Sequence, residues 1–429
     1  MLIIAAAIRG LLIASILLPA VGGAVTFTVD VPIQDAPDAV PGDGICSYDE
    51  NSPDDAPVCT LRAAVMEANA TDAQEDVAIV LTPGQTYELT IPGIDENFAA
   101  TGDLDIRRRM TIGVPDPAAA KAKIDATGKD RAFEFFQAND STLEGIEITG
   151  GFVSDGYGTA IIFPFSNQKI TLDFLDIHDN QSSSVGPGFR CAVQANAKLR
   201  DSHVHHNGSE EVGMRGVCNF GSGLTIVRST IDHNSSAGIN VQEGSLWLHT
   251  STVSENGAAG LFLLNADAVI YGSTIARNEG RQILFAANGQ ASKSLGLSGS
   301  ILESVGTNAC DIYQGDDSEL TFTTAWNLYS DDSCLSDVFF DHSKHNATLN
   351  LSELGDGGGP TPTHLPLSGS DAIDFAPASV CDQIGTDQRG LPRPVAQDGM
   401  LPALCDIGAV EVQPVPVEDA MFSNGFEAD

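Results

Sequence analysis

The chain has 429 residues, with 21 lysines and arginines against 58 aspartates and glutamates, so its formal net charge at pH 7 is −37. This balance excludes nucleic acids as partners, because neutralising phosphates needs clustered basic residues. Hydrophobic residues make up 42% of the chain, which excludes wholesale disorder. The length suits two or three ordinary domains, or a repeat architecture that grows in one direction.

The first 24 residues combine one basic residue, Arg9, with an apolar run over residues 11–18 and small residues before position 25. This pattern is typical of a secretory signal peptide and predicts export. Because residues 1–8 are already apolar, a membrane anchor and a misplaced start are the alternatives. No other apolar stretch could span a bilayer, so we expect no transmembrane segment in the mature chain.

Eight cysteines fall in four pairs that are close in sequence. An even number in an exported chain predicts disulfides. The sequence contains no CxxC spacing, which argues against a zinc site. We predict that neighbours pair, although eight cysteines allow many other connectivities. The predicted pairs are Cys46 and Cys59, Cys191 and Cys218, Cys310 and Cys334, and Cys381 and Cys405.

One six-residue pattern ending in asparagine returns five times between residues 170 and 280, at spacings of 27, 27, 22 and 22 residues. Periods of this length are typical of a solenoid. The segments between the asparagines are short, β-branched or apolar, and separated by Gly, Asn and Ser, which predicts strands and tight turns rather than helices. The pattern appears as LDIHDN (175–180), SHVHHN (202–207), STIDHN (229–234), STVSEN (251–256) and STIARN (273–278).

The predicted fold class is therefore all-β, a chain coiling into stacked parallel sheets with about 10–12 coils. The Ile or Val in each hexapeptide should point inward, and the asparagines should form an internal ladder, because stacked Asn side chains can donate to and accept from each other. The inward positions are Ile177, Val204, Ile231, Val253 and Ile275. The ladder positions are Asn180, Asn207, Asn234, Asn256 and Asn278.

An open solenoid end needs a cover, because it exposes unpaired backbone and apolar core. Residues 60–70 supply one: Leu61, Ala64, Val65 and Ala68 share one helical face, and Thr60 is placed to cap the helix N-terminus. This predicts an amphipathic helix at the N-terminal end.

Two stretches resemble known families of exported bacterial proteins. Residues 42–70 resemble the N-terminal CSLREA element, here Cys59-Thr-Leu-Arg-Ala-Ala64, with Thr60 and Ala63 departing from it. Residues 354–374 and 386–411 resemble the choice-of-anchor Q domain. The resemblance implies a bacterial, secreted or cell-surface, right-handed parallel β-helix with a pectin-lyase-like shape and an irregular C-terminal cap. It implies no reaction.

These observations divide the chain into five parts. The last part, a tail over residues 413–429, resembles short terminal motifs with a Gly-Phe-Glu core on exported proteins. The tail is expected to act in sorting or anchoring, and the alternative is a frayed end. The parts are a signal peptide (1–24), an N-terminal cap with the CSLREA-like motif (25–76), the parallel β-helix (77–352), the choice-of-anchor Q-like region (353–412) and a tail after a proline-rich hinge (413–429).

Aligned repeats would place His178, His205 and Asp232 in one outward column, which could bind a metal ion or shuttle a proton. An ordinary polar exterior is the interpretation we favour, because repeats generate such columns by default. A second column would contain His206, His233, Glu255 and Arg277.

Other charged groups also have two interpretations. Arg107 and Arg109 should share a strand face opposite Arg108, which favours a solvated strand over a phosphate site. Arg389 and Arg393 look like a base-bearing loop, but local packing is the preferred role. Acidic residues near the first two cysteines could hold a structural Ca²⁺, although a solvated loop is the default. They are Asp35, Asp38, Asp43, Asp49, Asp54 and Asp55.

No recognisable catalytic or cofactor-binding constellation appears, so we expect no cofactor and leave the identity of any metal ligands open. The favoured function is a non-catalytic, exported and monomeric surface or matrix module, with polysaccharide or cell-surface glycan as its candidate partner. The alternative is a polysaccharide lyase or glycoside hydrolase on the same scaffold, and a spacer without a ligand is a third. Exposed aromatic residues would favour glycan binding, but only Trp247 and Trp326 are tryptophans, and Trp247 could face either way.

Overall fold

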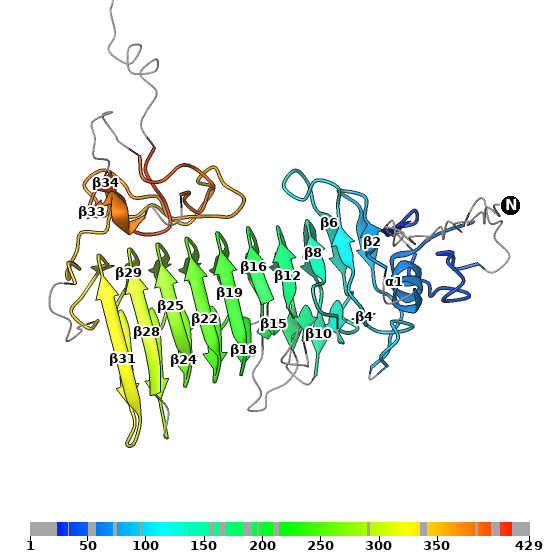
Figure 1. The fold of residues 1–429 in the computed structure, drawn as a ribbon, viewed down its shortest axis with the longest axis horizontal. Helices are drawn as coiled ribbons and strands as arrows, with labels where there is room; N and C mark the ends of the chain where they lie inside the picture. Colours follow the sequence, from blue (N-terminus) through cyan, green and yellow to red (C-terminus); the bar gives the residue numbers. More distant parts are fainter. Residues whose placement is uncertain are drawn as a thin grey trace, which may run out of the picture.

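The computed structural model describes residues 24–413, apart from 33, 50–56, 72–74, 95, 137, 155–157, 164–168, 183–190, 195–196, 209–213, 290–291, 335–340, 382–384 and 396–403. The predicted signal peptide, apart from Ala24, and the tail from residue 414 onward therefore lie outside the described residues. Within them the chain forms a parallel β-helix, a rod whose coils each contribute one strand to each of three sheets (Figure 1).

Sheet A has 11 strands, which pair in parallel from one coil to the next. They are β1 (Val25–Thr28), β2 (Val77–Val80), β5 (Thr111–Gly113), β8 (Thr142–Glu144), β12 (Ile170–Asp173), β16 (Ala197–Arg200), β19 (Gly223–Val227), β22 (Ser245–His249), β25 (Asp267–Tyr271), β28 (Ser292–Ser298) and β31 (Glu319–Ala325).

Sheet B follows after a sharp corner and has 10 strands, also parallel. They are β3 (Thr86–Glu88), β6 (Ala122–Asp125), β9 (Ile146–Thr149), β13 (Asp176–His178), β17 (His203–His205), β20 (Thr230–Asp232), β23 (Thr252–Ser254), β26 (Thr274–Ala276), β29 (Ile301–Glu303) and β32 (Leu328–Tyr329).

Sheet C closes each coil and has nine parallel strands. They are β4 (Leu104–Ile106), β7 (Phe133–Phe135), β11 (Ile161–Ile162), β15 (Cys191–Gln194), β18 (Arg215–Phe220), β21 (Ile239–Gln242), β24 (Leu261–Leu264), β27 (Ile283–Ala287) and β30 (Cys310–Gln314). Two small pairs complete the described strands: β10 (Phe152–Val153) with β14 (Gln181–Ser182), and β33 (Ala376–Pro377) with β34 (Leu404–Cys405). A single 3₁₀ turn, η1, covers Ala378–Val380.

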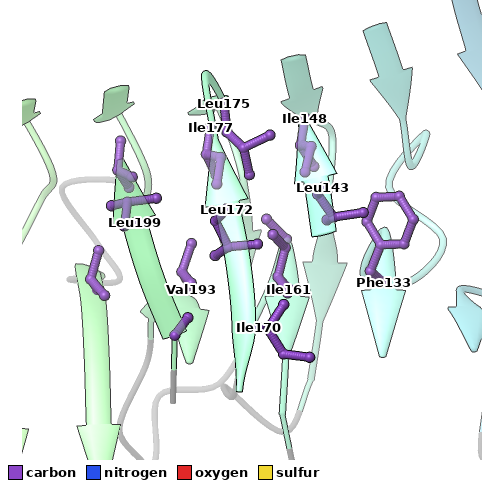
Figure 2. Packing of buried hydrophobic residues seen from close by; sticks show 14 of the residues in the cluster. Phe133, Leu143, Ile148, Ile161, Ile170, Leu172, Leu175, Ile177, Val193 and Leu199 are labelled. Atoms are coloured by element: carbon purple, nitrogen blue, oxygen red, sulfur yellow. The ribbon is translucent and has the colours of Figure 1, made fainter. Parts of the chain in front are cut away.

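The core lies between the three sheets, where each coil stacks its apolar side chains on those of the next. Figure 2 shows Leu172, Ile177 and Val193 from the three strands of one coil among their neighbours. The predicted inward row is fully buried, each member having no exposed side-chain surface. Its members are Ile177, Val204, Ile231, Val253 and Ile275, paired in register across sheet B.

The five repeat asparagines form a continuous hydrogen-bonded ladder at the corner after sheet B. Asn207 Nδ2 donates to Asn234 Oδ1 at 2.9 Å, and Asn234 Nδ2 donates to Asn256 Oδ1 at 3.0 Å. Each amide also donates to the carbonyl two residues before it, which closes a tight turn. At the end of the row Asn278 Nδ2 donates to Gln282 Oε1. The ladder therefore satisfies backbone groups that the turns remove from the sheets.

A second ladder, made of serines, occupies the corner between sheets A and B. The backbone N–H of Ser202 donates to Ser229 Oγ at 3.2 Å, and that of Ser229 donates to Ser251 Oγ at 3.2 Å. Ser273 and Ser300 continue the row. This ladder was not predicted from the sequence, although the serine that opens four of the five hexapeptides was its signal.

Helix α1 (Leu61–Ala70) covers the N-terminal end of the rod (Figure 1). Thr60 caps it as predicted, because its Oγ1 accepts a hydrogen bond from the Ala63 N–H at 3.1 Å. Burial extends beyond the predicted apolar face, since Arg62 is fully buried and its guanidinium pairs with Asp35 at 2.6 Å. This ion pair ties the helix to the segment before it.

Three of the four predicted disulfides are present in the structure: Cys46–Cys59, Cys310–Cys334 and Cys381–Cys405. The first lies beside α1, and the third staples the C-terminal region. Cys218 is disulfide-bonded, but the side chain of Cys191 lies outside the described residues, so that pair stays a prediction.

The C-terminal region lies over sheet B along the second half of the rod, drawn in orange and red in Figure 1. Gln388 bonds to the hydroxyls of Thr230 and Thr252, at 2.8 and 2.7 Å. His364 Nε2 pairs with Ser254 Oγ at 2.7 Å, while its Nδ1 faces the Ser352 carbonyl. The predicted cap is therefore a lid on the flank of sheet B as well as an irregular end.

Replacing one ladder asparagine should destabilise the rod. Asn234→Ala removes the acceptor of the Asn207 amide and the donor to two carbonyls, all in a fully buried corner. We expect a loss of about 2–3 kcal/mol in the free energy of unfolding, measured by urea denaturation. Asn308→Ala, at an exposed asparagine, is the control; equal losses for both variants would contradict the ladder's role.

Acid should release the C-terminal region from sheet B. Burial lowers the pKa of His364 to about 4, although its hydrogen bond to the Ser352 carbonyl acts in the opposite direction. Because an unfolded histidine titrates near 6.5, this group stabilises the docked state above that pH. The contribution, about 3 kcal/mol, is lost as the pH falls from 6.5 toward 4.

The measurement is limited proteolysis of the full chain between pH 7.5 and 4.5. Cleavage within residues 353–395 should accelerate on acidification, and His364→Gln should flatten that dependence. His342→Gln, at an exposed histidine, is the control and should leave it unchanged. A pH-independent cleavage rate in the unmodified protein would refute the expectation.

Candidate functional site

A cluster of histidines and carboxylates occupies strands β13, β17 and β20 of sheet B. The register pairs His178 with His205 and His205 with Asp232, so the repeats align as the sequence column requires. Ser254 and Ala276 follow in the same row and separate the cluster from Glu303, the next member.

A second outward row lies two residues earlier on each strand and was missed in the sequence. It pairs Asp176 with His203, and His203 with Thr230. The signal was available, because strand residues two apart share a face. The cluster therefore spans two rows, and its most closely packed pair, His203 and His205, comes from a single strand. Their rings stack with centroids 3.8 Å apart.

The corner residues form a third row, which is the second column predicted from the sequence, and it lies beside the same cluster. His206 and His233 precede the ladder asparagines and adopt left-handed backbone conformations, with φ of 50° and 48°. Their rings are parallel within 3° at 4.8 Å. Non-glycine residues rarely adopt such φ values. The asparagine ladder closes each turn and thereby holds these residues in that conformation.

Hydrogen bonds join these rows into two linked chains. In the first, Asp232 Oδ1 meets His203 Nε2 at 2.5 Å, Asp232 Oδ2 meets His233 Nδ1 at 2.7 Å, and His233 Nε2 meets Glu255 at 3.0 Å. In the second, Asp176 Oδ1 meets His205 Nε2 at 2.9 Å. His205 Nδ1 also lies 2.8 Å from the Nδ1 of its neighbour in sequence.

The environment shifts the pKa values of these groups in opposite directions. Burial opposes the charge of Asp232, yet hydrogen bonds from His203 and His233 hold the pKa of its carboxyl well below the usual range. Burial also opposes ionisation of Asp176, but the hydrogen bond from His205 leaves its pKa lowered. The hydrogen bond to Asp232 raises the pKa of His233. Burial, together with repulsion from His205 and His233, lowers the pKa of His206.

The cluster lies beside the docked C-terminal region rather than on an ordinary solvated exterior. Asp232 is only 3% exposed, because β20 is where Pro362 and Gln388 contact the sheet. The expectation of a plain polar exterior is therefore wrong at Asp232, whereas His178 and His205 of the same row are partly exposed. Asp176 and His205 on the earlier strands stay partly exposed.

Two sets of three side chains in this cluster bring possible ligand atoms within 4.8 Å of one another: Asp176 with His203 and His205, and His206 with Asp232 and His233. His178 belongs to neither set. It stacks on His205 at 4.9 Å, but its nitrogens face Asp179 and Glu147, at 2.8 and 3.3 Å.

A different surface lies on sheet A. Trp247 points outward and is 52% exposed, which answers the question left open by the sequence. Its row runs back through Thr225 and Lys198 to Thr171. A depression of about 370 Å³ lies over these strands, lined by Asp140, Lys169, Ile170, Thr171, Ala197, Lys198, Gly223 and Thr225. Beside the tryptophan, His249 stacks against its ring at 5.4 Å.

The arginines noted in the sequence have structural partners. Arg107 and Arg109 are exposed and Arg108 is buried, as the alternation predicts, but the three lie between β4 and β5 rather than in a strand. Arg389 bonds to Asp387 and to backbone carbonyls. Arg393 is enclosed with Glu411, 3.3 Å away. The preferred packing role of the last two residues agrees with these contacts.

The acidic residues near the first disulfide mostly face protein donors. Asp35 pairs with Arg62 and accepts two backbone N–H groups. Asp38 accepts from Val40 and Ser47, and Asp43 from Ile45. Asp54 and Asp55 lie outside the described residues, and a Ca²⁺ ion there stays a prediction.

A further acidic cluster, missed in the sequence, lies under the loop before β4. Its members are Asp103, Asp105 and Glu134. Burial raises the pKa of Asp105 to about 7, and burial with repulsion from Asp130 raises that of Asp103 well above its usual value. Arg131 lies 3.0 Å from Glu134 and 3.8 Å from Asp103, so its charge offsets part of the repulsion between these carboxyls.

Fold and site define the class of protein as a right-handed parallel β-helix with a lateral C-terminal lid. A family model described as "Right handed beta helix region" matches residues 170–325. Among solved structures, the chain is similar to the crystal structure of pectate lyase Pel9A, with 14% identity and a TM-score of 0.51. The match covers 91% of this chain and 98% of that one. At this identity it shows the fold alone. No curated protein sequence matches.

In the part of the chain that the structure describes, no helix is long and apolar enough to cross a membrane.

Imidazole titration tests the electrostatics of the cluster. In metal-free protein, His233 should titrate above the ordinary imidazole value of about 6.5 and His206 below it. Asp232→Asn should lower the pKa of His233, because the carboxylate that accepts its hydrogen bond is gone. Proton NMR of the ring signals measures both values, and coincident titration of the two rings would contradict the assignment.

Proposed function

We propose that the protein is an exported, non-catalytic surface or extracellular-matrix module that binds anionic polysaccharide lengthwise along sheet A. The observation that carries the proposal is Trp247, an exposed indole in a row whose preceding members, Thr225 and Lys198, line the depression. Export is supported by the predicted signal peptide and by the three described disulfides.

The chemistry of the surface suits a sugar chain. An indole face packs against the apolar face of a sugar ring, and threonine hydroxyls donate to and accept from sugar hydroxyls. Lys169 and Lys198 give the depression positive charge within a chain of net charge −37. Uronate carboxylates would therefore be attracted there and repelled elsewhere. Successive coils repeat the row at about 4.8 Å, which favours an extended polymer over a single sugar.

The groups described on this face support the non-catalytic part of the proposal. The lining of the depression contains one carboxylate, Asp140, whereas Ca²⁺ takes six to eight oxygen ligands and a hydrolase needs two acids. Although burial opposes their charge, hydrogen bonds from histidines lower the pKa values of Asp176 and Asp232, which disfavours either carboxyl as a proton donor.

The second candidate is a polysaccharide lyase or glycoside hydrolase on this scaffold. The observation in its favour is the partly exposed histidine–carboxylate network on sheet B, since such groups can transfer protons. Incubation with polygalacturonate, alginate and dextran, with Ca²⁺ or chelator, separates the two candidates. We expect no new reducing or unsaturated ends, and calcium-dependent cleavage would overturn the non-catalytic proposal.

Replacing Trp247 should weaken polysaccharide binding. We expect Trp247→Ala to raise the dissociation constant for polygalacturonate about tenfold, because an aromatic stacking contact is lost. Lys169→Ala with Lys198→Ala should weaken binding and reduce its sensitivity to salt. Affinity gel electrophoresis or calorimetry measures both effects.

The matched control is Tyr313→Ala, which removes an aromatic side chain of similar exposure, 53%, from sheet C. Its binding should equal that of the unmodified protein. Equal weakening by the tryptophan and tyrosine variants, or no binding of any glycan in the panel, would refute the proposal.

A further inference from the structure

We propose that Asp176, His203 and His205 form a binding site for a divalent transition-metal ion of the zinc class. The site lies on β13 and β17 of sheet B, on a different sheet from the proposed glycan surface, and is independent of it. Two imidazoles and one carboxylate are ligands that Zn²⁺, Cu²⁺ and Ni²⁺ prefer, whereas Ca²⁺ takes oxygen ligands.

The spacing of the ligand atoms fits one ion. Asp176 Oδ1 lies 2.9 Å from His205 Nε2 and 3.9 Å from His203 Nδ1. Ligands at about 2.0–2.1 Å from a tetrahedral ion are separated by about 3.3 Å, which lies between these two distances. One candidate atom from each of the three residues lies within 4.8 Å of the others, so small side-chain movements would complete the set.

The second nitrogen of each imidazole is held by a neighbour. His203 Nε2 meets Asp232 Oδ1 at 2.5 Å, leaving Nδ1 for the ion, and His205 Nδ1 meets His206 Nδ1 at 2.8 Å, leaving Nε2. Metal-bound histidines generally have such an outer partner, which fixes the ring and its tautomer. Asp232 is 3% exposed and is itself fixed by His233 at 2.7 Å, so it suits this supporting role.

The three ligands leave at least one coordination position open. Their side chains are partly accessible, at 29% for Asp176, 17% for His203 and 18% for His205. An ion could therefore enter from solvent and keep a water molecule. Nearby Glu147 and Asp179 add negative charge, while Lys121 opposes it.

The neighbouring set of His206, Asp232 and His233 is less suited to hold the ion. Both oxygens of Asp232 are already engaged, one by His203 and one by His233. His233 also uses its Nε2 on Glu255, at 3.0 Å. These groups therefore act as support for the first set rather than as a second centre.

The test is titration of the metal-free full chain with Zn²⁺ by calorimetry. We expect one ion per chain. Asp176→Asn and His203→Ala should each weaken binding at least tenfold, and Asp232→Asn should weaken it by about 10–100-fold through the outer shell. Co²⁺ substitution supplies a second readout, because its visible spectrum reports imidazole ligation. Millimolar Ca²⁺ should not displace the ion.

The matched control is His178→Ala, which removes a histidine from the same row that stacks on His205 but faces Glu147 and Asp179. Its affinity should stay within about threefold of the unmodified protein. Thermal unfolding of each apo variant separates lost ligands from lost folding. The proposal is overturned by no stoichiometric uptake, by an unchanged affinity in Asp176→Asn, or by equal losses in the His178 and His203 variants.

Discussion

The structure depends on the in-register stacking of one coil on the next. Each turn removes backbone groups from the sheets, and the ladder side chains at the corners replace the lost partners. Asn207, Asn234 and Asn256 pass hydrogen bonds from coil to coil while closing their own turns. A shift of one residue in any coil would break the hydrogen bonds between coils and open the asparagine-closed turn. It would also turn the apolar side chains of that coil outward.

The ladder also sets where glycine is required. Gly238 belongs to the chain just after the corner, where a Cβ would lie 2.7 Å from Val253 Cγ1 and 2.8 Å from Asn256 Nδ2. The asparagine amide therefore occupies space that only glycine leaves open. Corner residues such as His206 and His233 are held with positive φ by the same turns. The repeat thus fixes backbone positions first and leaves the outward side chains free to vary.

Variation in those outward side chains separates the two candidate surfaces. On sheet A the row of threonines and Lys198 leads to Trp247, which is 52% exposed. On sheet B the rows collect histidines and acids, and the C-terminal lid buries the far end of the cluster at Asp232. One scaffold therefore presents a polymer-sized face and a compact ligand set on adjacent sides. The glycan and metal proposals can fail separately.

Much of this arrangement could be predicted from the periodic part of the sequence. The spacing of Asn180 and Asn207 gave the coil length and the parallel sheets, because a solenoid repeats its contacts with its sequence period. The helix after Thr60 followed from local capping and an apolar face. The right-handed β-helix class is confirmed by the family model and the structural similarity. The serine ladder was within reach of the same repeat argument, and the row of His203 was within reach of the alternation of faces along a strand.

The remaining features depend on contacts between distant segments. Sequence alone determined the repeat, its inward row and its ladder, because those interactions recur between equivalent positions in successive coils. Only the tertiary structure decided that Gln388 and His364 of the C-terminal region contact sheet B, since no periodicity links them to β20 or β23. Asp232 lies beside these contacts and is 3% exposed, and its carboxylate pairs with His203 and raises the pKa of His233.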